Sequence, residues 1–198
     1  MVQQSERQGT GVVALVGSAG GLTAVEAVLA GLPSDLPVPV LVLLHLMHDR
    51  PSHAAAILTR HTSLAVKEAA HADRLEDGHV YVAPPDAHLR VLEGGTLALD
   101  REGPAVSYQR PSADVLLRSV VEVYDGRSIV VVLSGMGSDG AIGAEAVHAA
   151  GGTVFAQSEA TAGHYSMPAA AIATGAVDRV LSPSEIADAI VEVVGAAA

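Results

Sequence analysis

Short apolar runs that end in glycine or a polar residue are the feature that most constrains the fold of this chain. Three of them, GVVALVG, PVPVLVLLHL and SIVVVLSG, occupy residues 11–17, 37–46 and 128–135. Continuous apolar runs of this length are typical of strands that are buried on both faces of a parallel sheet. The run TVFAQ at 153–157 predicts a further strand of the same kind.

Segments with apolar residues at helical spacing alternate with these runs. We expect helices over residues 22–32, 50–61, 112–124, 139–152 and 182–194. Ser52 and Ser112 are candidate N-caps, and Ser182, Pro183 and Glu185 have the spacing of a capping box. The alternation predicts an α/β fold, a doubly wound and mostly parallel sheet flanked by helices.

Residues 64–100 have a different pattern of apolar and polar residues. Their second half, HVYVAPPDAHLRVLEGGTLALD, consists of short alternating runs that Pro84-Pro85-Asp86 and Gly94-Gly95 separate. Such breaks between short strands are typical of antiparallel hairpins. We therefore expect a β-hairpin insertion around residues 64–100.

Length and composition indicate one domain. The chain has 198 residues, enough to bury a sizeable core, and 49% of them are apolar. Its first ten residues, MVQQSERQGT, are polar and predict a disordered tail over 1–10, which leaves a domain over 11–198. Because the chain has no cysteine, we expect neither disulfides nor thiolate chemistry.

The charge balance argues against a nucleic-acid partner. The formal net charge is −11, and Lys67 is the only lysine, whereas phosphates require clustered basic side chains. No apolar stretch approaches the roughly 18 residues of a membrane span. We expect no membrane insertion and a cytoplasmic location.

Three polar side chains directly follow apolar strands. Ser18 follows 11–17, His45 lies at the end of 37–46, and Asp139 comes shortly after 128–135. Because ligand sites of doubly wound sheets lie at the carboxyl ends of the strands, these residues are expected at one edge. A hydroxyl, an imidazole and a carboxylate are the components of a nucleophilic triad.

Each of the three residues also has a structural explanation. Ser18 is suited to close helix–strand packing, His45 to a buried and hydrogen-bonded position, and Asp139 to capping the helix that it precedes. The pattern alone leaves the triad and these structural roles evenly balanced.

Other chemistries fit the glycine-rich turn at 17–21 less well. It lacks the GK[ST] of a P-loop and the G-x-G-x-x-G spacing of a dinucleotide site, and Val16 replaces the first glycine of G-x-S-x-G. A nucleotide-binding module is therefore the weaker hypothesis. His45, His48 and His53 could supply imidazoles to a metal, but Pro51 and the change from strand to loop argue against a shared face. We expect no metal and no cofactor.

Several longer motifs carry a family resemblance. In chain order they are LVGSAGG, LLHLM, VKEAAHADRLEDGHVYVAPPDAHL, QRPSADVLLRSV, VVLSGMGSDGAIGAEAVHAAGG and FAQSEATAGHYSMPAAAIATGAVDRVL. From about Gly11 to the C-terminal helix, the chain resembles the catalytic domain of the CheB-type protein-glutamate methylesterases of bacterial chemotaxis. The resemblance implies that Ser18 is the nucleophile, His45 the general base and Asp139 the orienting carboxylate. It further implies that the backbone N–H of Met136 forms the oxyanion hole.

The reaction implied by this resemblance is hydrolysis of glutamyl γ-methyl esters on methylated chemoreceptor helices or a similar methyl-ester protein. Deamidation of glutamine at such sites and a separate response-regulator partner are further expectations. A catalytically silent CheB-like binding or scaffold domain is the alternative. Family members commonly carry an N-terminal receiver domain, but about ten residues precede the first predicted strand, so control within the chain is not expected.

Three departures from the family pattern concern the site. Val16 and Ala19 replace the family's residues around the serine turn, and Leu46–Asp49 replaces its Met-Pro-Pro segment. In addition, a −11 chain repels a Glu-rich helix at long range unless arginines gather near the site. The candidates are Arg50, Arg60, Arg90, Arg110 and Arg118.

Overall fold

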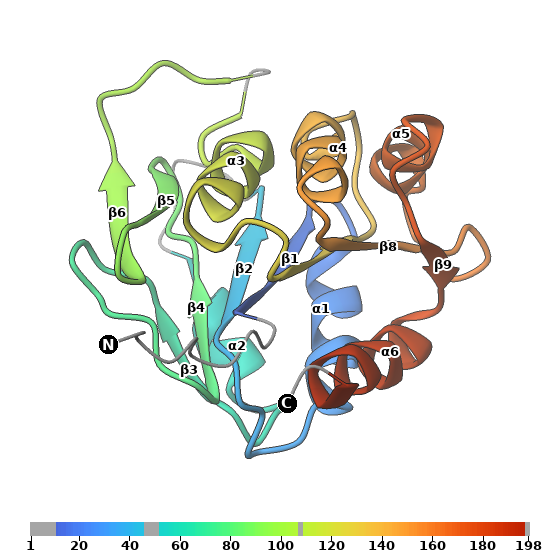
Figure 1. Cartoon of the computed structure of the whole chain (residues 1–198), viewed down its shortest axis with the longest axis horizontal. Coiled ribbons are helices and arrows are strands. Elements are labelled where there is room, and N and C mark those ends of the chain that lie inside the picture. Colours follow the sequence, from blue (N-terminus) through green and yellow to red (C-terminus); the bar gives the residue numbers. More distant parts are fainter. Residues whose placement is uncertain (1–10, 46–51, 107–108, 197–198) are drawn as a thin grey trace, which may run out of the picture.

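A seven-stranded parallel sheet forms the centre of the protein (Figure 1). It is seen in a computed structural model that describes residues 11–45, 52–106 and 109–196. Its strands are β1 (Val12–Gly17), β2 (Val40–Leu44), β3 (Ala65–Glu68), β4 (His79–Val82), β7 (Ser128–Val132), β8 (Thr153–Gln157) and β9 (Arg179–Leu181). They lie in the order β3-β4-β2-β1-β7-β8-β9, and every adjacent pair is parallel.

Helices cover both faces of this sheet, as the alternation of strands and helices predicts. They are α1 (Gly21–Ala30), α2 (Ala54–Leu58), α3 (Ala113–Tyr124), α4 (Ala141–Ala149), α5 (Ser166–Ala173) and α6 (Pro183–Ala196). Helices α1, α2 and α6 pack on one face and α3, α4 and α5 on the other (Figure 1). No helix in the described part of the chain is long and apolar enough to cross a bilayer.

The pleat of β1 divides its side chains between two cores. Val13 and Leu15 pack with α1 and α6, whereas Val12, Ala14 and Val16 pack with α3, α4 and α5. All five are fully buried. This two-sided burial explains why the strand reads as a continuous apolar run, since neither of its faces meets water.

The strand order reverses between β1 and β7. From β1 the chain continues to β2 on one side, and β7 leads to β8 and β9 on the other. Loops that leave adjacent strands at such a switch point diverge to opposite faces and open a crevice at the carboxyl ends. The segments after β1, β2 and β7, which contain Ser18, His45 and Asp139, meet at this edge.

The predicted hairpin insertion is correct only for residues 88–100. Strands β5 (His88–Leu92) and β6 (Thr96–Asp100) form an antiparallel hairpin. The prediction is wrong for 65–82, because β3 and β4 lie parallel to each other and extend the main sheet beside β2. The predicted disordered tail at 1–10 lies outside the described residues.

The predicted helix starts have different outcomes. Ser182 and Glu185 form the capping box: Glu185 accepts the Ser182 N–H at 2.8 Å. His53 and not Ser52 occupies the N-cap position of α2, but the Ser52 hydroxyl accepts the N–H of Ala54, the first residue of the helix, at 3.2 Å. Ser112 occupies the N-cap position of α3, but its hydroxyl makes no capping bond. That hydroxyl bonds instead to a residue of the candidate site.

Candidate active site

Ser18 and His45 follow neighbouring strands in register. Gly17 of β1 pairs with Leu44 of β2. Ser18 and His45 are the residues that directly follow this pair, one on each strand. The His45 N–H continues the ladder by donating to the Gly17 carbonyl at 3.1 Å. Val16 and Leu43, two residues earlier, face α3 and α4. Since side chains alternate along a strand, the pleat directs Ser18 and His45 to that same face.

The turn that carries Ser18 is fixed by Ser134, which follows β7. The Ser18 N–H donates to the Ser134 carbonyl at 2.9 Å, and the Ser134 hydroxyl donates to the Ala19 carbonyl at 2.8 Å. Gly20 has φ +75°, and a Cβ there would lie 2.7 Å from the Ser134 hydroxyl. Both the backbone conformation and the close approach require glycine at this position.

Gly135 allows the segment after β7 to approach Ser18. A Cβ on Gly135 would lie 2.9 Å from the Cβ of Ser18 and would also clash with the Met167 sulfur. The Gly135 backbone is held on both sides, because its N–H donates to the His164 carbonyl and its carbonyl accepts the Met167 N–H. The position of Ser18 therefore depends on segments after both β1 and β7.

His45 and Asp139 form a buried hydrogen-bonded pair. His45 Nε2 lies 2.8 Å from Asp139 Oδ2, and the side chains are 6% and 3% exposed. Burial alone would raise the pKa of Asp139, but hydrogen bonds from His45, Ser112 and the Ala113 and Asp114 N–H groups hold it below its ordinary value. Asp139 is thus ionised at neutral pH and acts as the acceptor, so a neutral His45 carries its proton on Nε2.

The other ring nitrogen of His45 has no partner among the described residues. Nδ1 is buried and makes no hydrogen bond to the described residues. The Ser18 hydroxyl makes none with it, so the structure joins His45 to Asp139 and places Ser18 beside them without the third link. Catalytic hydrogen bonds often form only when a substrate is bound.

Asp139 caps a helix, but not the helix that it precedes. Its carboxylate accepts the N–H groups of Ala113 and Asp114 at the start of α3, at 2.7 and 3.2 Å. The Ser112 hydroxyl donates to Oδ1 at 2.8 Å. The expected capping of the following helix, α4, is therefore wrong, since Asp139 caps α3, the helix before β7 in the chain. Asp139 Oδ2, which accepts the Ala113 N–H, is also the oxygen that contacts His45.

Met136 lies in the glycine-rich loop between β7 and α4. It is 63% exposed, and the next residue, Gly137, has φ +86°. Its N–H donates to no acceptor among the described residues. A free backbone donor beside Gly135, which contacts Ser18, is available to an anion that develops near the serine.

A comparison with known proteins identifies the family. The CheB methylesterase family profile matches residues 13–190. The chain belongs to the CheB methylesterase family. Apart from Val12 of β1, the match covers all seven strands of the main sheet and the segments that carry Ser18, His45 and Asp139.

Relatives and a solved structure agree with this CheB assignment. A Myxococcus xanthus protein named protein-glutamate methylesterase/protein-glutamine glutaminase 1 is 43% identical over 90% of this chain and 52% of its own length. A Burkholderia lata protein of the same name is 41% identical over 89% and 52%. The chain thus spans about half the length of these relatives. The crystal structure of the Thermotoga maritima CheB methylesterase catalytic domain superposes with a TM-score of 0.88 at 32% identity, covering 92% of this chain and 97% of that one.

Two of the three histidines considered for a metal, His45 and His53, lie in the described part of this CheB-family chain. His45 is engaged by Asp139, His53 lies at the start of α2, and His48 lies outside the described residues. In the parts of the chain that the structure describes, no three His, Cys, Asp or Glu side chains are placed to hold a metal ion.

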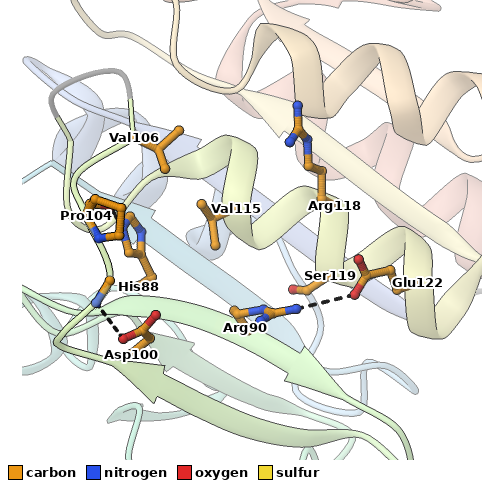
Figure 2. A pocket seen from close by; sticks show the side chains of 10 residues that line it. His88, Arg90, Asp100, Pro104, Val106, Val115, Arg118, Ser119 and Glu122 are labelled. Carbon is orange, nitrogen blue, oxygen red and sulfur yellow. Dashed lines mark hydrogen bonds and ion pairs between the residues drawn. The ribbon is translucent and has the colours of Figure 1, made fainter.

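A cavity of about 230 Å³ lies between α3 and the β5–β6 hairpin of the CheB fold (Figure 2). His88 forms part of its wall, and Arg90 reaches Glu122 of α3 at 3.5 Å. The cavity does not include Ser18, His45 or Asp139. It is therefore separate from the candidate site, although His88 connects the two through Ser112.

Two of the five arginines that could offset the acidic charge lie at this cavity. Arg90 and Arg118 line it. Arg110 is paired with Asp86 at 2.6 Å and donates to the Gly103 carbonyl at 2.9 Å. Arg50 lies outside the described residues.

Sequence reasoning treated Ser112 only as a cap and did not select Asp114, although both lie in the QRPSADVLLRSV motif.

Proposed function

We propose that this chain is a serine esterase that hydrolyses glutamyl γ-methyl esters on chemoreceptor-like proteins. The observation that carries the proposal is the buried bond between His45 Nε2 and Asp139 Oδ2 at 2.8 Å, beside the strand end that bears Ser18. A carboxylate that fixes an imidazole, with the other ring nitrogen free, is the arrangement that activates a serine. The family assignment and the names of the relatives give the substrate class.

In the proposed first step, Ser18 Oγ attacks the ester carbonyl carbon and His45 Nδ1 takes the hydroxyl proton. Asp139 stabilises the imidazolium that results. The carbonyl oxygen becomes an oxyanion, and the Met136 N–H donates to it. When the C–O bond to the methoxy group breaks, His45 returns the proton to the leaving group, and methanol departs from an acyl-enzyme.

In the second step, water replaces methanol. His45 removes a proton from a water molecule that attacks the acyl carbon. As the bond to Ser18 Oγ breaks, His45 returns this proton to Ser18, and the released γ-carboxyl group loses its remaining proton to solvent to give a glutamate carboxylate. An amide passes through the same acyl-enzyme with ammonia as the leaving group. Glutamine deamidation is therefore part of the proposal, in keeping with the double name of the relatives.

Methylation makes the substrate compatible with an acidic enzyme. The chain carries a net charge of −11, which repels Glu-rich helices. A methyl ester is uncharged, so a methylated helix is less acidic than the product and is repelled less. We propose cytoplasmic receptor helices as the partner, and a separate response-regulator protein as a second partner.

A fluorophosphonate probe tests the nucleophile. We expect covalent labelling, located on Ser18 by peptide mass spectrometry, that Ser18→Ala abolishes and His45→Ala strongly reduces. Ser138→Ala is the matched control, because Ser138 is an exposed serine in the β7–α4 loop near the site. An intact fold without labelling would contradict the triad and favour the binding-module alternative.

Methanol release from methylated receptor fragments tests the substrate. We expect release by the wild-type chain and none by Ser18→Ala. Labelling of Ser18 without methanol release would retain the esterase and overturn the proposed substrate.

A further inference from the structure

Helices α3 and α4 exchange carboxylates at their N-terminal ends. Asp139, just before α4, accepts the N–H groups of Ala113 and Asp114 in α3. In return, Asp114 Oδ1 accepts the N–H groups of Gly140 and Gly143 at 3.0 and 2.7 Å. Each carboxylate occupies the N-terminal end of the other helix, where unpaired N–H groups and the helix dipole favour negative charge. The exchange joins the residue after Asp139 directly to α3.

This exchange places two buried carboxylates close together, at a cost. Burial raises the pKa of Asp114, and the charge of Asp139 raises it further. The unpaired N–H groups at a helix start can be bonded without burying a charge, since an uncharged Ser or Asn caps a helix as well as Asp does. Fixing the backbone directly after Asp139 is a gain that offsets this cost, because Gly140 is the next residue and donates directly to Asp114.

Ser112 also binds the carboxylate of Asp139. Its hydroxyl donates to Asp139 Oδ1, and its N–H donates to His88 Nδ1 at 3.2 Å. His88 is 2% exposed, and its Nε2 lies 3.0 Å from the Pro104 carbonyl. Both ring nitrogens of His88 are thereby used, which fixes Ser112 in place. His88, whose side chain Figure 2 shows at the cavity wall, supports the site from outside it.

The bonds divide between the two oxygens of Asp139. Oδ1 accepts from Ser112 and the Asp114 N–H, and Oδ2 accepts from the Ala113 N–H and His45. Four donors from fixed positions leave one side-chain rotamer that satisfies all of them. A rotation of the carboxylate would leave buried donors unpaired.

We propose that Asp114 and Ser112 are positioning residues that hold Asp139 in the rotamer in which Oδ2 meets His45 Nε2. They act through Asp139 and contact neither the ester nor Ser18. The consequence for catalysis rests on the proposed function, since it requires His45 to be the base. The consequence for the His45 ring does not, because a fixed Asp139 selects the Nε2–H tautomer whether or not the chain is an esterase.

Two substitutions at one position separate positioning from folding. Asp114→Ala removes the acceptor for Gly140 and Gly143, whereas Asp114→Asn retains a side-chain oxygen that can accept both N–H groups. We expect Asp114→Ala to slow fluorophosphonate labelling of Ser18 by about tenfold or more, as displaced catalytic groups do, and Asp114→Asn to restore most of the rate. Ser112→Ala is expected to act in the same direction.

Asp178→Ala is the matched control for lost stability. Asp178 also accepts a backbone N–H, that of Val154 at 2.7 Å, but at the opposite end of the sheet. The control is expected to lower the unfolding temperature and to leave the labelling rate at the wild-type value. Equal losses of rate in Asp114→Ala and Asp178→Ala would overturn the proposal.

The ¹⁵N NMR signals of the His45 ring, assigned by their loss in His45→Asn, supply a readout that does not need activity. We expect an Nε2–H tautomer in the wild type and in Asp114→Asn, and a mixture of tautomers in Asp114→Ala and Ser112→Ala. A wild-type tautomer in all four overturns the positioning role. If the four proteins show the expected tautomers but the wild type is never labelled by the probe, the proposed function is contradicted and the positioning role remains supported.

Discussion

His45 Nε2 lies 2.8 Å from Asp139 Oδ2, although the two residues are 94 positions apart in the chain. The pair is buried, and His45 Nδ1 has no hydrogen-bond partner among the residues that the structure describes. A hydrogen bond to an ionised carboxylate fixes the tautomer of a neutral imidazole, so the geometry determines which nitrogen can accept a proton. In the proposed reaction, Nδ1 takes the proton of Ser18.

Asp139→Asn tests this tautomer. A carboxamide has one acceptor oxygen, so in either orientation two of the four donors that surround Asp139 lose their acceptor. We expect the labelling rate and kcat for methanol release to fall by about 10⁴-fold, the size typical of a triad with the wrong tautomer. Asp178→Asn is the control and is expected to keep the wild-type rate. A loss below about tenfold would show that Asp139 does not orient the base.

Met136→Pro tests the oxyanion donor. Proline has no N–H, whereas Met136→Ala retains it and removes only an exposed side chain. We expect Met136→Pro to lose about 100-fold or more in kcat and Met136→Ala to remain near the wild type. Circular dichroism and the unfolding temperature establish that both variants fold. Equal losses in the two would assign the effect to the side chain, against the proposed backbone role.

Gly135→Ala tests the close approach of the β7–α4 loop to Ser18. The new Cβ would lie 2.9 Å from the Ser18 Cβ and clash with Met167, so the serine turn or the loop has to move. We expect a loss of about 1–3 kcal/mol in the free energy of unfolding, as for an overpacked core, measured by urea denaturation.

The same variant is also expected to label at least about tenfold more slowly, because a small displacement of the nucleophile is costly. Gly195→Ala is the control. Nothing lies within 4 Å of a Cβ at that position in α6, so the substitution is expected to be neutral or stabilising. A Gly135→Ala variant with wild-type rate and stability would contradict the contact.

The sequence predicts that Ser18 and His45 follow neighbouring strands because that signal is local. A polar residue directly after an apolar strand is expected at the carboxyl edge of a doubly wound sheet, and Ser18 and His45 lie at the ends of the paired strands β1 and β2. The partners of Asp139 could not be found in this way. Asp139 lies two residues before α4 but caps α3, some 25 residues earlier in the chain, and no local pattern encodes a bond between two helix ends.

The error at 65–82 has a similar cause. The segment that contains β3 and β4 has the length and breaks of hairpin strands, but its partners in the sheet are decided by packing beside β2. Strand propensity depends on packing context, so the local sequence does not determine which strand another strand pairs with. Strand β9, with three residues, is too short to give a periodic signal, and it pairs with β8.

The dependence of stability on pH tests the exchanged carboxylates. Burial raises the pKa of Asp114 above its ordinary value of 3.8. Below that value Asp114 is protonated in both the folded and the unfolded chain. As the pH rises, the unfolded chain ionises first, so the folded state binds more protons and the wild type loses stability until the pH passes the folded pKa.

Asp114→Asn cannot ionise and does not have this loss. We therefore expect its free energy of unfolding, relative to the wild type, to increase as the pH rises from about 4 to about 7. Urea denaturation of both proteins across that range measures the difference. A relative stability of Asp114→Asn that stays constant or decreases would show that the folded state does not disfavour the Asp114 charge, and the electrostatic cost of the α3–α4 exchange would then be absent.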